Sequence, residues 1–425
     1  MPEPFSRRRL LKSSLVAATA ASVSPNLLLG KAKGANSRLR VGVMGLSRGK
    51  GHIKAFLEVP NCEVAYICDV DETRLNGGIK TVEGKQDPLP QTVTDFRRIL
   101  EDDSIDALSI AAPNFWHAPA TILGCEAGKH VFVEKPGSYS PHEASRMVEV
   151  AEATDRQVQM GTQRRSYPGM LDAKRQIDQG LIGLVRAARC YYSNQRQSIG
   201  VGKPADPPPN LDWTLWQGPV PDAAYKDNLV HYNWHWHWLY GGGEMANNGV
   251  HSLDVARWMT GVNYPTRITC NGGRYHYDDD QETPDTCHAL FDYGDLALTW
   301  ESSSCHKRKP EPPAFVTLYG DKGKMDIGTA NFTAFDLDGQ EIAKNVDPPS
   351  DVPHFTNFAD AIREGTPLNQ PIADAQVSTM LCHLANIAYR TGGSVSVDPS
   401  NGNLVNHPAG EELWKRPAYR PGWEV

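Results

Sequence analysis

Short apolar runs alternate with amphipathic stretches along the first third of the chain. Residues 39–44 form a β-branched run, residues 52–59 carry apolar side chains at helical spacing, and residues 62–68 form a second apolar run. This order predicts a strand, a glycine-containing turn, a helix and a second strand, which is a βαβ unit. The alternation continues to residue 163 and predicts a doubly wound parallel sheet with helices on both faces. The later elements expected are strands at 105–113, 130–136 and 156–163 and helices at 117–128 and 140–154.

The chain beyond residue 163 shows a different pattern. Apolar runs predict strands of one sheet at 185–195, 266–277, 285–293, 296–303 and 315–320. Amphipathic stretches predict helices at 354–365 and 375–393. We therefore expect an α/β protein with an N-terminal Rossmann domain and a C-terminal α+β domain that carries a large, open, mostly antiparallel sheet. An open sheet face favours pairing with a second copy, so a homodimer or homotetramer is expected.

The length supports this division, because 425 residues exceed what one hydrophobic core usually holds. We expect four segments along the chain. They are a signal segment at 1–35, a nucleotide-binding domain at 36–163, a substrate and oligomerisation domain at 164–395, and a C-terminal tail at 396–425.

The N-terminal segment differs from the rest in its composition. The stretch from Ser6 to Lys12 reads SRRRLLK and resembles a twin-arginine export signal, and a weakly apolar run rich in Ala and Ser follows to about Leu29. A disordered basic N-terminus is the alternative. We expect the twin-arginine translocation machinery to export the folded chain, to the periplasm or beyond. Cleavage near Ala20, cleavage near Ala35 and retention as an anchor all stay open.

Charge and cysteine content narrow the function classes. The net charge of -7 provides no basic face for nucleic acid. No stretch outside the signal segment approaches the length and apolarity of a membrane-spanning helix. Eight cysteines are present without a C-x-x-C pair. Because folding would precede export, we expect buried thiols, and the even count leaves a disulfide open.

A glycine-rich turn follows the first predicted strand, in a form that departs from G-x-G-x-x-G. Backbone N–H groups in such a turn and at the next helix N-terminus bind a pyrophosphate. The candidates for this contact are Gly45, Ser47, Arg48, Gly49 and Lys50. Asp69 lies 24 residues after Gly45, the spacing expected of the acid that binds the adenosine ribose. Asp69 favours NAD(H), while Arg48 and Lys50 leave NADP(H) open.

Two longer stretches carry a family resemblance. They are AAPNFWHAPATILGCEAGKHVFVEKP, which ends in Glu134-Lys135-Pro136, and GGGEMANNGVHSLDVARWMTG. Together they resemble the Gfo/Idh/MocA oxidoreductase family, over about residues 39–390, and in particular its twin-arginine-exported members similar to glucose-fructose oxidoreductases. The resemblance implies a Rossmann domain, a C-terminal open sheet flanked by helices, and nicotinamide-dependent oxidation or reduction of a sugar, cyclitol or polyol.

The resemblance also implies roles for individual residues. Lys135 matches the catalytic lysine near the nicotinamide, and His251 matches the catalytic histidine of the C-terminal domain. The further cofactor contacts expected are Pro113, Asn114, His117, Glu134 and Gln163. Asn247 stands where the family usually has an acid, one helical turn before His251. An amide cannot carry a proton, so we expect Asn247 to bind a substrate hydroxyl. Asp254 either orients His251 or is a structural acid, and we favour the structural role.

An aromatic stretch, VHYNWHWHWLY, precedes the second motif. Rings with polar edges suit the faces and hydroxyls of a sugar, and a packed core is the equal alternative. The candidates for substrate contact are Tyr232, Asn233, Trp236, Trp238 and Tyr240. His231, His235 and His237 lack a fixed metal-ligand spacing, so we expect no metal site.

Three functions remain at this point. The first is an oxidoreductase that holds its cofactor tightly and recycles it within the catalytic cycle. The second is redox-neutral, NAD-dependent glycoside cleavage, elimination or epimerisation through a transient keto-sugar. The third is a sugar-binding protein that has lost the chemistry, which Asn247 favours, whereas Lys135 and His251 favour an enzyme. An exported enzyme cannot exchange its cofactor with a cytoplasmic pool, which favours a cofactor that travels with the folded protein.

Overall fold

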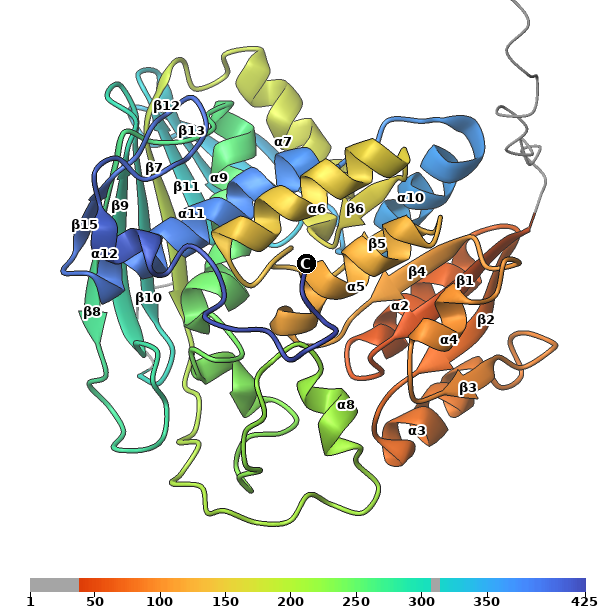
Figure 1. Ribbon diagram of the computed structural model, residues 1–425. Coiled ribbons are helices and arrows are strands. Elements are labelled where there is room, and N and C mark those ends of the chain that lie inside the picture. The colour runs from red at the N-terminus through yellow and green to blue at the C-terminus, as the bar shows by residue number, and fades with distance from the viewer. Residues whose placement is uncertain (1–37, 307–313) are drawn as a thin grey trace, which may run out of the picture. The chain divides into compact units, whose positions relative to one another are not determined.

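A computed structural model describes residues 38–306 and 314–425 (Figure 1). The expected twin-arginine signal and its cleavage sites lie outside these residues. Within the described part, no helix is both long enough and apolar enough to cross a bilayer.

The N-terminal domain is built on a six-stranded parallel sheet. The strand order is β3-β2-β1-β4-β5-β6, and every neighbouring pair runs parallel. This order confirms the predicted doubly wound sheet, in which ligands bind at the carboxyl ends of the strands. The strands are β1 (Leu39–Met44), β2 (Cys62–Cys68), β3 (Gln91–Val93), β4 (Ala107–Ile110), β5 (His130–Val133) and β6 (Val158–Met160). The helices are α2 (Gly49–Glu58), α3 (Glu72–Val82), α4 (Arg97–Leu100), α5 (Asn114–Glu126) and α6 (Pro141–Thr154).

Local sequence explains where these helices begin. The Asp71 carboxylate accepts the backbone N–H groups of Thr73 and Arg74 at the start of α3. The Ser140 hydroxyl accepts an N–H at the start of α6, where Pro141 occupies the first turn. Both caps fix the direction in which a helix leaves the carboxyl edge of the sheet.

The C-terminal domain is built on a nine-stranded sheet in the order β14-β13-β12-β11-β7-β10-β9-β8-β15. Only β7 and β10 pair in parallel among these strands, which confirms a mostly antiparallel sheet. The strands are β7 (Val185–Ser193), β8 (Arg267–Gly273), β9 (Thr286–Asp292), β10 (Ala297–Ser303), β11 (Val316–Gly320), β12 (Gly323–Ile327), β13 (Asn331–Asp336), β14 (Glu341–Val346) and β15 (Ser394–Ser396). The apolar pattern did not predict β12 to β15, because β12 and β13 are buried only at alternate positions and β14 and β15 are largely exposed, so none of them leaves a continuous apolar run.

Helices and short turns complete this domain. The helices are α7 (Pro168–Asp178), α8 (Trp213–Gln217), α9 (Val250–Thr260), α10 (Val352–Glu364), α11 (Ile372–Arg390) and α12 (Pro408–Glu411). The short turns are η1 (Gln163–Ser166), η2 (Asn233–Trp236) and η3 (Met245–Gly249), the last of which is a π-helix.

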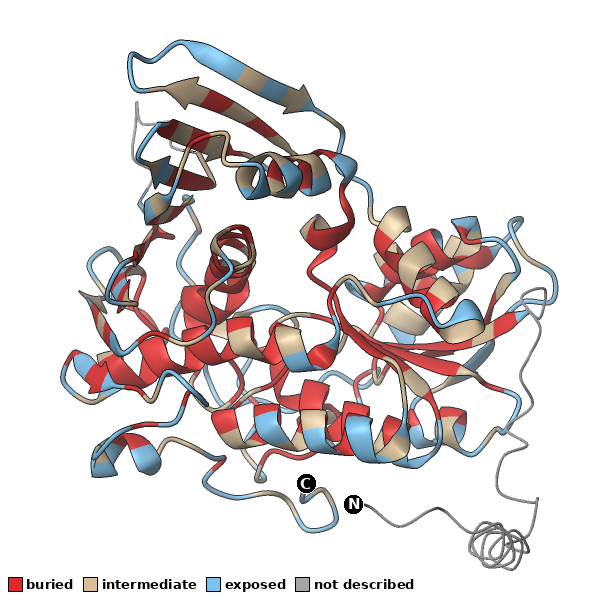
Figure 2. Ribbon diagram, turned by 90° about the horizontal axis from the view of Figure 1, so that it is seen from above, coloured by how far each residue is buried: buried red, intermediate tan, exposed pale blue. Residues whose placement is uncertain are grey.

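Helix α11 joins the two domains. It packs against β8 and α9 on one side and against α6 and β6 on the other (Figure 1). The Gly137 N–H donates to Thr379 Oγ1 at 3.2 Å, which ties the turn after β5 to α11. Buried residues fill the parallel strands and the helices between the sheets (Figure 2). The turns at the carboxyl edge of the parallel sheet are therefore held against the second domain.

The C-terminal tail packs onto the Rossmann domain. Arg416 forms an ion pair of 2.8 Å with Glu143, and both side chains are buried. The Trp423 ring packs edge-on against Trp116, with the ring centres 4.9 Å apart. The last residues of the chain thus reach the carboxyl edge of the parallel sheet, although they are far from it in sequence.

Candidate active site

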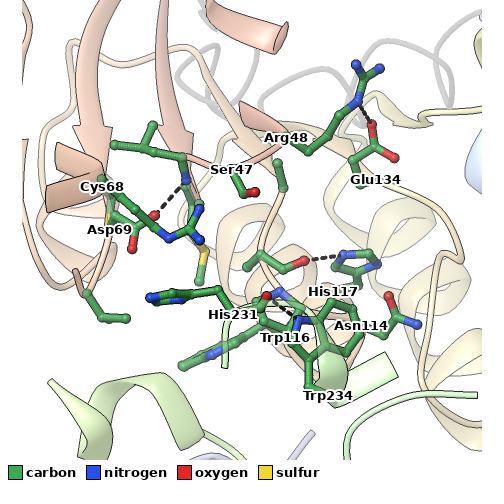
Figure 3. Close-up of a pocket in the computed structure, with 18 of the residues that line it drawn as sticks. Ser47, Arg48, Cys68, Asp69, Asn114, Trp116, His117, Glu134, His231 and Trp234 are labelled. Carbon is green, nitrogen blue, oxygen red and sulfur yellow. Dashed lines mark hydrogen bonds and ion pairs between the residues drawn. The ribbon is translucent and has the colours of Figure 1, made fainter. Parts of the chain in front are cut away.

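A cavity of about 510 Å³ lies at the carboxyl ends of β1, β2, β4 and β5. Its other walls come from the segment 215–251, from η1 and from the C-terminal tail. Figure 3 shows Asp69 on one side of this cavity and the Arg48–Glu134 ion pair on the other. Of the predicted site residues, the following line it: Gly45, Ser47, Arg48, Asp69, Pro113, Asn114, His117, Glu134, Lys135, Gln163, Tyr232 and His251.

The turn after β1 has the backbone shape that a dinucleotide requires. Gly45 has φ +85°, and a Cβ there would lie 2.6 Å from the Ala111 carbonyl oxygen, so only glycine fits. Helix α2 begins at Gly49 with no side-chain cap and no acid in its first turn. Its Gly51 N–H already donates to the Arg48 carbonyl oxygen at 2.8 Å, but no side chain caps the other N–H groups of this turn, and a pyrophosphate suits this position.

Asp69 anchors this turn from the end of β2. Its carboxylate accepts the Leu46 N–H at 2.7 Å and the Asp71 N–H at 3.0 Å. Burial raises the pKa of Asp69, and these two N–H groups oppose the rise. Next to it, His231 Nε2 donates to Asp71 at 2.8 Å. This contact brings the aromatic stretch of the second domain over the ribose end of the cavity, as Figure 3 shows for Asp69 and His231.

Aromatic rings close the same end of the cavity. Trp116 and Trp423 meet edge to face, and Phe96 lies 6.4 Å from Trp423 in a stacked arrangement. All three residues line the cavity. Flat apolar walls beside an acid that can bind ribose hydroxyls suit an adenosine group.

Glu134 organises the turn after β5. Its carboxylate accepts Arg48 Nε at 2.9 Å, His52 Nε2 at 3.0 Å and Gln163 Nε2 at 3.4 Å. Burial alone would raise the pKa of Glu134, but the hydrogen bond from His52 and the charge of Arg48 hold it well below its usual range. Arg48 also pairs with Asp351 at 2.7 Å, so its charge is neutralised from two sides.

Lys135 reaches across to the second domain. Its Nζ donates to the backbone oxygen of Asn247 at 2.8 Å and to the side-chain Oδ1 at 3.0 Å. Burial lowers the pKa of Lys135, and the nearby carboxylates of Glu134 and Glu244 oppose this. Asn247 lies in the π-helix η3, a widened turn of a kind often found at functional sites. Asn247 contacts Lys135 and does not line the cavity, so the structure does not place it where it was expected to bind a substrate hydroxyl.

His251 lies in the first turn of α9 and lines the cavity. Burial lowers its pKa well below the usual range, and the charges of Lys135 and Arg164 add to the effect. The imidazole is therefore neutral at neutral pH. Asp254 binds Arg165 through contacts of 2.8 and 2.9 Å and accepts the Ser378 hydroxyl at 2.7 Å. This network supports the structural role of Asp254.

His117 connects the loop after β4 to the E-K-P turn. Its two ring nitrogens lie 2.6 Å from the Pro136 carbonyl oxygen and 2.9 Å from that of Ala112. Pro113 and Asn114 line the cavity beside it. The loop that the family resemblance places along the cofactor is thus bound directly to the turn that carries Lys135.

Several predicted contacts do not line this cavity. Trp236 is buried beneath the Arg196 guanidinium at 4.6 Å, Tyr240 packs against Phe115 at 5.5 Å, and Trp238 lies under Arg390 at 4.9 Å. These three rings are packing residues in this structure, because their loop winds between the two domains. Beyond them, Gly49, Lys50 and Asn233 also lie outside the cavity lining.

The sequence did not single out other residues that line the cavity. They include Trp116, Arg164, Tyr167, Trp234, Asp351 and Trp423. His235, considered only for a metal, stacks on Trp234 with ring centres 3.6 Å apart and donates from Nδ1 to the Tyr232 carbonyl at 2.6 Å. Burial lowers the pKa of His235 to about 3, so its Nε2 keeps a free lone pair. In the described residues, no three His, Cys, Asp or Glu side chains converge as metal ligands, and all eight cysteines carry free thiols.

Two family models match the chain in consecutive blocks. Residues 39–162 match the oxidoreductase family with an NAD-binding Rossmann fold, and residues 195–425 match the C-terminal alpha/beta domain of that family. The second block alone covers more than half of the chain. The chain belongs to the Gfo/Idh/MocA oxidoreductase family. This confirms the family and the NAD-binding Rossmann domain inferred from the two motifs.

Curated relatives carry names from glycoside hydrolysis. A glycosyl hydrolase family 109 protein of Shewanella pealeana is 34% identical over 162 residues, which is 37% of this chain and 36% of that relative. An alpha-N-acetylgalactosaminidase of Shewanella oneidensis is 30% identical over 162 residues, which is 37% of this chain and 35% of that relative. The matched stretch thus spans little more than a third of each relative.

Solved structures share the fold at low identity. The WlbA dehydrogenase of Bordetella pertussis, in complex with NADH and UDP-GlcNAcA, matches with a TM-score of 0.65 at 17% identity, over 85% of this chain and 99% of that one. An aldose-aldose oxidoreductase of Caulobacter crescentus matches with a TM-score of 0.65 at 18% identity, over 85% of this chain and 100% of that one. At these identities the likeness concerns the fold alone.

Proposed function

We propose that the chain is an NAD(H)-dependent oxidoreductase that acts on a hydroxyl-bearing carbon of a sugar, cyclitol or polyol and keeps its cofactor through the catalytic cycle. The carrying observation is that Lys135 and His251, from different domains, line one cavity together with a turn shaped for a dinucleotide.

The residues at one end of the cavity fit NAD. Gly45 and the uncapped start of α2 suit the pyrophosphate, and Asp69 suits the ribose hydroxyls. Asp69 lines the cavity and repels the extra phosphate of NADP. When bound, the nicotinamide supplies a hydride acceptor or donor.

The residues at the other end fit proton transfer at a hydroxyl group. His251 is neutral, so it can accept the hydroxyl proton as a general base, a role worth about 10²–10⁴ in rate. Lys135 holds a positive charge that stabilises a developing alkoxide. Asn247 fixes the position of Lys135 through two hydrogen bonds and is a positioning residue in this account.

Several contacts favour a cofactor that dissociates slowly. Trp423 closes the adenosine end, and the His231–Asp71 contact lies over the ribose end. Two backbone bonds add to this closure, from Glu72 N–H to Asn210 O at 3.0 Å and from Asp212 N–H to Val70 O at 2.9 Å. A retained cofactor also agrees with the expected export of the folded chain.

A second candidate is redox-neutral glycoside cleavage through a transient keto-sugar. The names of the curated relatives favour this reaction. Redox-neutral cleavage also returns a retained cofactor to its starting oxidation state in every turnover. A non-catalytic sugar-binding role is the third candidate, and the buried Lys135 beside His251 argues against it.

Incubation with a panel of sugars and aryl glycosides, with no cofactor added, separates these functions. Mass spectrometry identifies the products, and the near-ultraviolet absorbance of reduced nicotinamide reports net redox change. An oxidised or reduced sugar supports the oxidoreductase, and a hydrolysed glycoside with unchanged absorbance supports redox-neutral cleavage. Lys135→Ala should abolish either product, while Lys80→Ala, an exposed lysine of α3, serves as the matched control. Binding without any product would contradict both catalytic functions.

A further inference from the structure

Arg164 lines the cavity without an anionic partner. Its side chain follows Gln163 in η1 and lies over the Phe315 ring at 4.4 Å. Its Nε is buried and has no hydrogen-bond partner in the part of the chain that the structure describes. In residues 38–306 and 314–425, no carboxylate lies within ion-pair distance of this guanidinium.

The other arginines near the Lys135 end of the cavity are paired, whereas Arg74 lines the opposite end, near Asp69. Arg48 pairs with Glu134 and Asp351, and Arg196 pairs with Glu244 at 2.6 Å. Even Arg165, the next residue in the chain, forms an ion pair with Asp254. Arg164 therefore differs from these three arginines, each of which has a carboxylate partner.

Arg164 is half-buried, and a cation that has lost part of its water without gaining an opposite charge is costly to the folded protein. Burial accordingly lowers the pKa of Arg164. The charge of Arg164 adds to the lowering of the pKa of Lys135 by burial, and the side-chain partner of Lys135 is the uncharged amide of Asn247. The nearby carboxylates of Glu134 and Glu244 already bind arginines. The catalytic end of the cavity thus has two cations whose charge no adjacent carboxylate neutralises.

We propose that the substrate is a sugar acid whose carboxylate pairs with Arg164 while its reacting hydroxyl group faces Lys135 and His251. This inference rests on the proposed function, because it places the sugar in the same cavity. A guanidinium is the side chain best suited to bind a carboxylate through two parallel hydrogen bonds.

The cofactor is another source of negative charge for Arg164. Its pyrophosphate, however, fits the turn at Gly45 and the start of α2, where Arg48 lies. Loss of bound dinucleotide from an Arg164 variant would assign the guanidinium to the cofactor, so the test measures cofactor and sugar separately.

The test uses pairs of sugars that differ only in a terminal carboxylate or hydroxymethyl group, such as glucuronate and glucose or galacturonate and galactose. Calorimetry measures their affinity for the as-purified full chain, for Arg164→Gln, and for Arg186→Gln, an exposed arginine of β7 as the matched control. Dinucleotide content is assayed in each protein after denaturation.

We expect the wild type and Arg186→Gln to bind one acidic sugar about 10–100-fold more tightly than its neutral counterpart, the range expected of a charge-assisted hydrogen bond. Arg164→Gln should lose that preference and keep both its dinucleotide and its affinity for the neutral sugar. Arg164→Lys, which keeps the charge, should retain part of the preference and guards against a folding defect in the glutamine variant. Equal affinity of the wild type for acid and neutral sugars across the panel would overturn the inference. Wild-type protein that neither contains nor binds NAD would instead overturn the proposed function.

Discussion

Replacing Asn247 by aspartate tests how Lys135 is used. The substitution keeps the side-chain shape and places a carboxylate 3.0 Å from Lys135 Nζ. An opposite charge at such a distance shifts a pKa by about 1–3 units, which corresponds to about 1.4–4 kcal/mol. In the wild type, burial lowers the pKa of Lys135, and the carboxylate of the Asn247→Asp variant should raise that pKa.

The direction in which the pH profile of the rate moves depends on what the positive charge of Lys135 does. If protonated Lys135 stabilises the alkoxide, activity persists below the pKa of Lys135 and falls as the pH rises through it. A raised pKa therefore moves the alkaline limb of the rate profile upward, by about 1–3 pH units. Activity at neutral pH should be retained.

The assay is the pH dependence of kcat in the wild type, in Asn247→Asp and in Asn76→Asp. Asn76 is an exposed residue of α3, so its variant adds the same charge far from Lys135. We expect only Asn247→Asp to move the alkaline limb. A limb that stays in place or moves to lower pH would refute the role given to Lys135. An inactive Asp variant with normal sugar binding would do the same.

Three further substitutions have defined outcomes. Lys135→Ala should abolish turnover and leave the melting temperature nearly unchanged, and turnover equal to wild type would remove Lys135 from the mechanism. His251→Ala should reduce kcat at least about a hundredfold, the scale of a general base, whereas a change in KM alone would reassign His251 to substrate binding. Asp254→Ala should lower the free energy of unfolding by about 3–5 kcal/mol, because it removes a buried partner of Arg165. Denaturant titration measures that loss, and a stability equal to wild type would show that the remaining Arg165–Asp374 contact suffices.

The N-terminal fold was predictable because its pattern is regular. Each buried strand ends in a turn with a recognisable residue, such as Gly45 after β1 or Asp69 after β2, and helical spacing follows. Strands with two buried faces leave a continuous apolar run that a sequence shows directly. The edges of the second sheet gave no such signal, since β14 alternates between exposed and half-buried positions.

The site was predictable where one motif fixes backbone and chemistry together. The E-K-P turn placed Lys135, and the spacing from Gly45 identified Asp69. The aromatic stretch allowed no such inference, because ring direction in a loop depends on packing, and Trp236 turned under Arg196. Trp423 reaches the cavity only through the return of the tail, which no local pattern encodes.

The central claim is that the chain keeps a nicotinamide dinucleotide bound through export and catalysis. The most direct measurement is to purify the protein without added cofactor from the periplasmic or extracellular fraction in which we expect it, denature it, and assay the supernatant for NAD(H). We expect close to one dinucleotide per chain, because Trp423 and the His231–Asp71 contact lie at the end of the cavity that suits the adenosine group. A supernatant without NAD(H), from protein shown to be folded, would contradict the claim.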